Sequence, residues 1–294
     1  MSSNAMIRSG TLRTVVNAVQ KLYPQALADK TWDNTGLLLE APDRIDRAPL
    51  KAHKVLLTID LTKAVADEAI SLKSSVIVAY HPIIFRPLKS LTLANTQQES
   101  LLKLAQEGIS VYSPHTAVDA TIGGVNDWLA DGISGGKGEE SGRAVIEGVK
   151  DVPGYEDSGM GRIITLKEPE EFQELVDRVK RFLGLKQVMI GSPPGGKRVR
   201  TIAVCAGSGA SMFKNIDADL LFTGELSHHE ALAAKERGVG FITCEIGFHT
   251  NSERGFLRDV MKGKLTEVLK NEAEREVEFE VVVSERDRDP FEIV

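Results

Sequence analysis

One sequence motif occurs twice in the chain: a hydrophobic run typical of a buried strand, followed by a histidine and, four residues later, a carboxylate. The later copy ends in His249 and Glu253, and the earlier copy ends in His115 and Asp119. A turn of helix after each strand brings the histidine and the acid to one side of the strand's carboxyl end. The repeat therefore predicts two related halves that each present a histidine and a carboxylate.

Along the whole chain, hydrophobic runs alternate with amphipathic segments. The pattern predicts strands over residues 54–60, 76–80, 110–113, 162–166, 201–205, 220–223 and 277–284, and helices over 11–23, 62–73, 101–107 and 169–183. Such alternation is typical of an α/β fold with helices on the faces of mixed sheets. Residues 132–144 hold few hydrophobic side chains, so we expect a linking loop there, between an N-terminal half (1–135) and a C-terminal half (145–294).

Composition narrows the class of protein. A net charge of −6 argues against a dedicated nucleic-acid binder. Both cysteines, Cys205 and Cys244, lie in hydrophobic runs and are expected to be buried thiols. We find no run long enough to span a membrane and no secretory signal, and expect a cytoplasmic protein, with the nucleus and mitochondria as further compartments. Residues 3–5 resemble the remnant of a cleaved tag, so Met6 is the expected natural start.

Five of the six histidines fall at the ends of predicted strands: His81, His115, His228, His229 and His249. Ligand sites of open α/β sheets form at the carboxyl ends of strands. Imidazole and carboxylate together suit zinc, iron, manganese, cobalt or nickel. The sequence therefore predicts that each chain binds one or two divalent ions. His53 lies in a polar stretch, without a companion.

Two further motifs each allow two interpretations. His228 and His229 are adjacent on a predicted helix and point about 100° apart, so one at most can face a pocket. Glu225 and His229 are candidates for general acid/base catalysis, and a surface cluster at a helix start is the alternative. The glycine-rich segment 207–211 is either a phosphate cradle or, as we prefer, a plain tight turn.

Several motifs together resemble the NIF-three-like family (also called DUF thirty-four) over nearly the whole chain: Trp32-Asp33-Asn34-x-Gly36-Leu37, Tyr80-His81-Pro82-x-x-Phe85, His115-Thr116-x-x-Asp119, Thr223-Gly224-Glu225 and His249-x-x-x-Glu253. The resemblance implies a dinuclear metal centre between two α/β halves and a homohexamer of stacked trimers. It implies four ligands, His81, Asp119, His249 and Glu253, with a carboxylate able to bridge two ions. It makes His115 an outer ligand or a residue behind the ligands.

Tyr80 departs from the His-His-Pro form of many family members and is similar to the eukaryotic form. Tyrosine is a poor ligand unless ionised, because its reference pKa is about 10. Neighbours on a strand point to opposite faces, so the strand must become irregular if Tyr80 and His81 are both to reach the centre. We expect Tyr80 at the pocket wall and two unequal metal positions.

The resemblance implies a metal-dependent hydrolase of the cyclohydrolase kind, although nothing in the sequence shows a guanine pocket. The alternative is a non-catalytic protein that handles metals or binds a partner in transcription regulation. An open coordination position and a substrate-sized cleft would favour the hydrolase.

Overall fold

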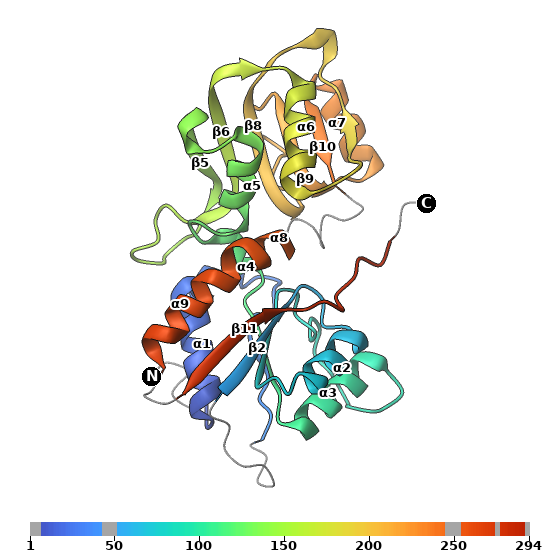
Figure 1. Cartoon of the computed structure of the whole chain (residues 1–294). Helices are drawn as coiled ribbons and strands as arrows, with labels where there is room; N and C mark the ends of the chain where they lie inside the picture. The colour runs from blue at the N-terminus through green and yellow to red at the C-terminus, as the bar shows by residue number, and fades with distance from the viewer. Residues whose placement is uncertain (1–6, 43–51, 245–253, 274–276, 292–294) are drawn as a thin grey trace. The chain divides into compact units, whose positions relative to one another are not determined.

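Two mixed β-sheets, each covered by helices, form the architecture of the computed structural model (Figure 1). The structure describes residues 7–42, 52–244, 254–273 and 277–291. The chain divides into two units, the first of Met1–Val118 with Phe256–Arg288 and the second of Asp119–Gly255 with Asp289–Val294. Each unit is described by itself below.

The first unit is built on a sheet in the order β1-β4-β3-β2-β11. Its strands are β1 (Gly36–Leu39), β2 (Ala52–Thr58), β3 (Val76–Ala79), β4 (Ser110–Ser113) and β11 (Glu278–Val283). Strands β11, β2, β3 and β4 run parallel, and β1 is antiparallel to β4. The carboxyl ends of β2, β3 and β4 therefore share one edge of the sheet.

Helices pack on both faces of this sheet. Helices α1 (Gly10–Leu22) and α9 (Lys262–Glu272) lie together on one side of β2 and β11, and α2 (Lys63–Ser71) and α3 (Thr96–Glu107) lie on the other (Figure 1). Burial between α2, α3 and the strands forms a core in which Leu56, Ile77 and Leu104 have no solvent exposure. Side-chain caps fix two helix starts, since Thr62 accepts from the Val65 N–H and Asn95 from the Gln97 and Gln98 N–H groups.

Short helices connect the elements of the first unit to their neighbours. These are η2 (Gln25–Leu27), α4 (Thr116–Ala120), α8 (Arg254–Phe256) and a π-helix (Leu257–Met261) that leads directly into α9. The unit boundary falls within α4 and again within α8.

The second unit is built on a sheet in the order β5-β6-β8-β9-β10-β7. Its elements are β5 (Glu140–Gly148), β6 (Gly159–Glu170), β7 (Met189–Gly191), β8 (Val199–Ser208), β9 (Leu220–Glu225), β10 (Gly240–Thr243), α5 (Val125–Ser134), α6 (Phe172–Leu183), α7 (His228–Glu236), η3 (Lys137–Glu139) and η4 (Pro194–Gly196). The central strands β8, β9 and β10 are parallel, and the flanking pairs are antiparallel. Ala203, Cys205 and Leu221 pack toward Ala234 of α7, and α5 packs with α6.

A buried ion network joins α5 to β5 and β6. Asp127 accepts from Arg162 at 2.8 Å and from Arg143 at 3.1 Å, and Arg143 also bonds Glu140. Burial by itself would raise the pKa of Asp127, but the bonds and charge of Arg162, with bonds from the Gly123 N–H and Arg143, lower it to about 2. The network needs Asp127 ionised, because Arg162 is only 2% exposed.

The predicted α/β class with mixed sheets and face-packed helices is confirmed. The predicted loop 132–144 is different in the structure, because α5 continues to Ser134 and β5 begins at Glu140. Gly132 lies inside α5, where a Cβ would meet the ring of Phe182, so this glycine permits close helix packing. The predicted division into 1–135 and 145–294 also differs from the two units, because β11 pairs with β2 in the first sheet.

Smaller expectations have clear outcomes in the described residues. In segment 207–211, β8 continues to Ser208 and a turn follows, in which the Met212 N–H donates to Gly209 O at 3.0 Å. Thr223 of β9 bonds the segment from the side, since its hydroxyl accepts from the Gly209 N–H at 3.0 Å and donates to Gly207 O at 2.9 Å. Both cysteines are buried, which raises the pKa of each thiol to about 12. No helix in the described ranges combines the length and hydrophobicity that crossing a membrane requires.

Candidate metal centre

The shared edge of the first sheet brings three chain segments together just past their strands. Asp60 follows β2, Tyr80 and His81 follow β3, and His115 follows β4. The chain after β3 stays bonded to β2, because the Tyr80 N–H donates to Thr58 O at 2.8 Å and the His81 N–H donates to Ile59 O at 3.0 Å. The sheet thus fixes where both side chains leave the backbone.

Three rings form a cluster at this edge. The ring centroids of His81 and His115 are 5.4 Å apart, and Tyr80 lies 5.1 Å from His81 and 5.5 Å from His115. All three pairs are edge-to-face, with interplanar angles of 63–88°. Strand β3 ends at Ala79, so Tyr80 and His81 are not held on opposite faces of a strand and both rings contact His115. This agrees with the expectation that the strand becomes irregular at this point. Tyr80 is only 3% exposed and so lies in the wall of the cluster.

Each histidine of the cluster is held by a carboxylate. His81 Nδ1 lies 2.9 Å from Asp60 Oδ1, and His115 Nδ1 lies 2.7 Å from Asp33 Oδ1. Metal-ligating histidines typically donate one ring N–H to a carboxylate, which fixes the tautomer and directs the other nitrogen to the ion. In both rings that other nitrogen is Nε2. Imidazole nitrogens are ligands that zinc and iron accept, so these two rings supply two donors of the kind such an ion needs.

Asp33 accepts hydrogen bonds through both of its oxygens, and its side chain has no solvent exposure. It accepts from His115 Nδ1 and the Asn34 N–H through one oxygen, and from the Thr116 hydroxyl and N–H through the other. Burial alone would raise the pKa of Asp33, but the bonds and charge of His115 together with Thr116 lower it. An ionised Asp33 therefore fixes the His115 ring.

His115 itself has an unusual backbone, with φ of +31°. This region is sparsely populated for residues with a side chain, and such conformations cost roughly 1–3 kcal/mol. Strain of this kind persists where surrounding bonds over-determine it, and it is concentrated at functional sites. Here the bonds of Asp33 to His115 and Thr116 hold the turn between β4 and α4.

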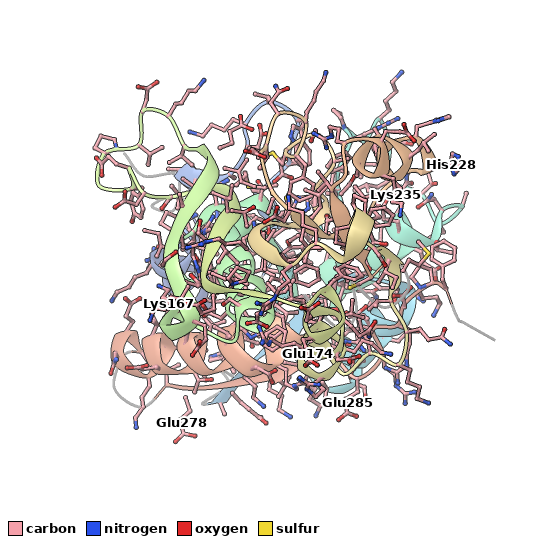
Figure 2. All side chains as sticks on the ribbon, turned by 90° about the horizontal axis from the view of Figure 1, so that it is seen from above. Lys167, Glu174, His228, Lys235, Glu278 and Glu285 are labelled. Carbon is pink, nitrogen blue, oxygen red and sulfur yellow. The ribbon has the colours of Figure 1, made fainter. Side chains whose placement is uncertain are left out.

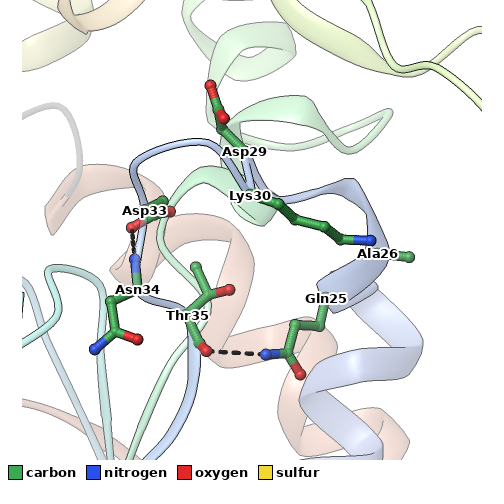
Figure 3. A pocket seen from close by; sticks show the side chains of 7 residues that line it. All are labelled: Gln25, Ala26, Asp29, Lys30, Asp33, Asn34 and Thr35. Atoms are coloured by element: carbon green, nitrogen blue, oxygen red, sulfur yellow. Dashed lines mark hydrogen bonds between the residues drawn. The ribbon is translucent and has the colours of Figure 1, made fainter.

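The loop that supplies Asp33 also borders a pocket of about 440 Å³ (Figure 3). Its lining residues are Gln25, Ala26, Asp29, Lys30, Asp33, Asn34 and Thr35. Gln25 Nε2 donates to Thr35 O at 2.9 Å, and Gly36 next to it has φ of +111° and would clash with Gln25 if it had a side chain. A substrate-sized hollow thus lies beside the carboxylate that holds His115.

His53 provides a contrast within the same unit. Its Nδ1 lies 2.8 Å from the Ser75 hydroxyl and its Nε2 lies 3.2 Å from the Thr11 hydroxyl, so both nitrogens bond to protein. Burial lowers its pKa, which favours the neutral ring. His53 therefore connects β2 to its neighbours and does not resemble a ligand. The sequence pattern placed His53 in a polar stretch without a companion, whereas the structure places it in β2 with two hydrogen-bond partners.

The remaining predicted residues are Asp119, Glu225, His228 and His229, which the structure describes, and His249 and Glu253, which it does not. Asp119 is 6% exposed in α4, and its backbone carbonyl accepts from Asn126 at 3.1 Å. Glu225 ends β9 at the surface, and His228 and His229 are exposed at the start of α7, where Figure 2 shows His228 pointing outward. Ser227 and Glu230 form a capping box around that start, as the surface alternative expects. His249 and Glu253 lie outside the described residues.

Within residues 7–42, 52–244, 254–273 and 277–291, no three histidine, cysteine or acidic side chains form a group close enough to hold a metal. Of the predicted centre, these ranges contain His81, His115 and Asp119. Sequence reasoning missed the two acids behind the histidines. Asp60 stands at the end of a predicted strand, and Asp33 lies in the Trp32-Asp33-Asn34 motif, so both positions carried a signal.

Fold and site together define a class: α/β proteins with carboxylate-held histidines at the ends of parallel strands. A family model described as Duf34/NIF3 (NGG1p interacting factor 3) matches residues 10–290. The chain belongs to this family and is a eukaryotic-type member, which confirms the resemblance seen in its motifs.

Relatives match nearly the full length. The chain is 52% identical to the Protein NIF3 homolog of Schizosaccharomyces pombe, covering 93% of this chain and 94% of that protein. It is 44% identical to NGG1-interacting factor 3 of Saccharomyces cerevisiae, covering 99% of each. A crystal structure of a Bacillus cereus protein related to NIF3 superposes with a TM-score of 0.76 at 21% identity, covering 98% of this chain and 100% of that one, and so shares the fold.

Proposed function

We propose that the chain binds divalent metal ions, with His81, Asp119, His249 and Glu253 as ligands and His115 as an outer ligand or support. The observation that carries this proposal is the pair of adjacent imidazoles, each held through Nδ1 by a carboxylate. Zinc, iron, manganese, cobalt and nickel all suit such a donor set. Asp60 and Asp33 orient the rings and increase their basicity.

The reaction class that we propose is metal-dependent hydrolysis. A divalent ion, when bound, lowers the pKa of a coordinated water and polarises a substrate oxygen. Asp33 and Asp60 keep the imidazoles in one tautomer, and the buried Tyr80 ring shields one side of the cluster from water. Glu225 and His229 stay candidates for proton transfer, and both are exposed to solvent.

The test is metal analysis of purified protein, followed by a hydrolase screen with each metal added back. We expect hydrolysis to depend on added metal and to fail in Glu253→Gln, because the amide keeps the shape but removes the charge that holds an ion. A matched control is Glu230→Gln, which changes an exposed capping residue. Unchanged turnover in Glu253→Gln would show that the activity arises elsewhere.

A second candidate function is binding of a protein partner in transcription regulation. Its support is the name of the yeast relative, NGG1-interacting factor 3, which matches 99% of this chain. In this role, a fraction of the protein molecules would be in the nucleus, in addition to those in the cytoplasm. Binding between the purified chain and the purified NGG1-type protein of the same source tests the proposal, and no association at micromolar concentration would contradict it.

We also propose that the chain forms a homo-oligomer, a hexamer in the arrangement that family resemblance implies. Light scattering at micromolar concentration measures the mass directly. A monomer mass would contradict this proposal and leave the metal proposal intact.

A further inference from the structure

An exposed aromatic wall stands next to the histidine pair. It consists of Trp32, which is 52% exposed, and Phe85, which is 46% exposed. Their ring centroids are 6.0 Å apart at an interplanar angle of 52°. Trp32 also meets the ring of His115 edge-on, at 5.8 Å and 87°. A half-exposed tryptophan that contacts a candidate metal histidine calls for an explanation, since large aromatic side chains are mostly buried.

The wall is fixed in place by the two residues that follow Trp32. Asp33 is bonded to His115 and Thr116, as described above, and the Asn34 side chain donates to Ile84 O, one residue before Phe85. The backbone on both sides of the wall is therefore tied to the same edge of the sheet. A fixed aromatic surface loses little conformational entropy when a ring stacks on it.

We propose that Trp32 and Phe85 form a stacking site for a planar aromatic heterocycle, whose polar substituent then lies toward His81 and His115. This assigns a substrate class to the centre. The delivery of the substituent rests on the proposed metal function, but the stacking itself does not. Stacking on an aromatic side chain tolerates many ring types, because each heterocycle has a π-face.

A small ring fits these observations better than a protein surface does. The wall continues directly into polar groups, with His81 27% and Asp60 39% exposed at their side chains. Recognition sites for small molecules combine apolar and aromatic walls with a few convergent polar groups. If a protein covered the wall instead, Trp32 would be shielded in the assembly, and the experiment below would show it.

The test uses the full chain in a Trp128→Phe background, which leaves Trp32 as the one tryptophan of the sequence. Adenosine, guanosine and cytidine are titrated with and without zinc, and ribose is the non-aromatic control. We expect saturable quenching by the nucleosides and none by ribose. Calorimetry with the native tryptophans should show binding about tenfold weaker in Trp32→Leu and in Phe85→Leu, and retained in Trp32→Phe.

Three results would overturn the proposal: no saturable binding by any nucleoside, equal binding by ribose, or affinity unchanged in both leucine variants. Acrylamide quenching adds a further check, since a Trp32 shielded by a partner copy would also contradict an open stacking site. Nucleoside binding in zinc-free protein separates the two ideas. If stacking persists while the chain fails to bind metal, the metal function is wrong and the aromatic site stands.

Discussion

At the scale of single residues, Asp33 shows how the centre is held. Its two oxygens accept on opposite sides, one from His115 and one from Thr116, although the histidine is 82 positions away in sequence. The contact fixes both a strained backbone and the direction of an imidazole. It also anchors the loop that carries Trp32.

Asp33→Asn should weaken zinc binding by about 10- to 100-fold, the usual effect of losing the group behind a ligating histidine. An amide can accept on one side only, and its NH₂ would face either His115 Nδ1 or Thr116. Competitive zinc titration measures the effect. Asp29→Asn is the matched control, because that exposed carboxylate bonds Thr31 in the same loop. Equal affinities in the two variants would contradict a supporting role for Asp33.

The free energy of unfolding of the second unit should depend on pH through Asp127, whose pKa is lowered to about 2. The unfolded value is about 3.9, so the stabilisation is complete above about pH 4 and is lost as the pH falls through 2. The shift corresponds to about 2 kcal/mol. Urea unfolding of wild type and Asp127→Asn at several pH values measures it.

The difference in unfolding free energy between these two proteins should shrink by that amount as the solution is acidified. Asp157→Asn, a change at an exposed position of the same unit, should show no such trend. If the difference in unfolding free energy between wild type and Asp127→Asn did not change with pH, the ionised carboxylate would not be the source of the stabilisation.

At the scale of elements, the contact between α5 and α6 depends on a residue with no side chain. A Cβ at Gly132 would run into the ring of Phe182, which itself packs on Trp128 at a centroid distance of 4.4 Å. Nothing comparable surrounds Gly263 in α9, where a Cβ would meet no atom within 4 Å. The two glycines are thus a matched pair in helices.

Gly132→Ala should destabilise the protein by about 1–3 kcal/mol, because Phe182 must move. Gly263→Ala should instead stabilise it by about 1 kcal/mol through helix propensity. Chemical denaturation gives both values. The same sign for both variants would contradict the packing account.

Sequence patterns predict local elements well but do not predict contacts between residues that are far apart in the chain. Periodicity located the strands before His81 and His115 and the helices around them, because those patterns are local. Gly132 read as part of a loop, since its neighbour Phe182 lies 50 positions later in the chain. A motif and a strand end marked the positions of Asp33 and Asp60, but nothing local showed that each would bond a histidine. Such contacts depend on the sheet order, which the hydrophobic pattern leaves open.

At the scale of the whole molecule, the end of the chain completes the sheet that carries the histidines. Strand β11 pairs in parallel with β2 across six residue pairs, from Glu278 with Ala52 to Val283 with Leu57. Beyond it, Asp287 Oδ2 accepts from the Ile59 N–H at 2.9 Å, one residue before Asp60. The C-terminal segment therefore fixes the position from which Asp60 reaches His81.

Asp287→Ala should cost about 1–3 kcal/mol of stability, because the buried Ile59 N–H loses its acceptor. Thermal and urea unfolding measure this. Glu285→Ala is the control and should change stability by less than about 0.5 kcal/mol, since Figure 2 shows this side chain pointing outward. If the two variants were equally stable, the anchoring of β2 by the C-terminal segment would be refuted.

The central claim is that carboxylate-held histidines at one sheet edge bind a divalent ion. Equilibrium dialysis of the apoprotein against zinc, with metal content measured by mass spectrometry, tests it most directly. We predict that wild type and His228→Ala retain the same zinc, and that His81→Ala loses at least one bound ion while keeping the wild-type circular dichroism spectrum. Wild-type zinc content in a folded His81→Ala protein would contradict the claim.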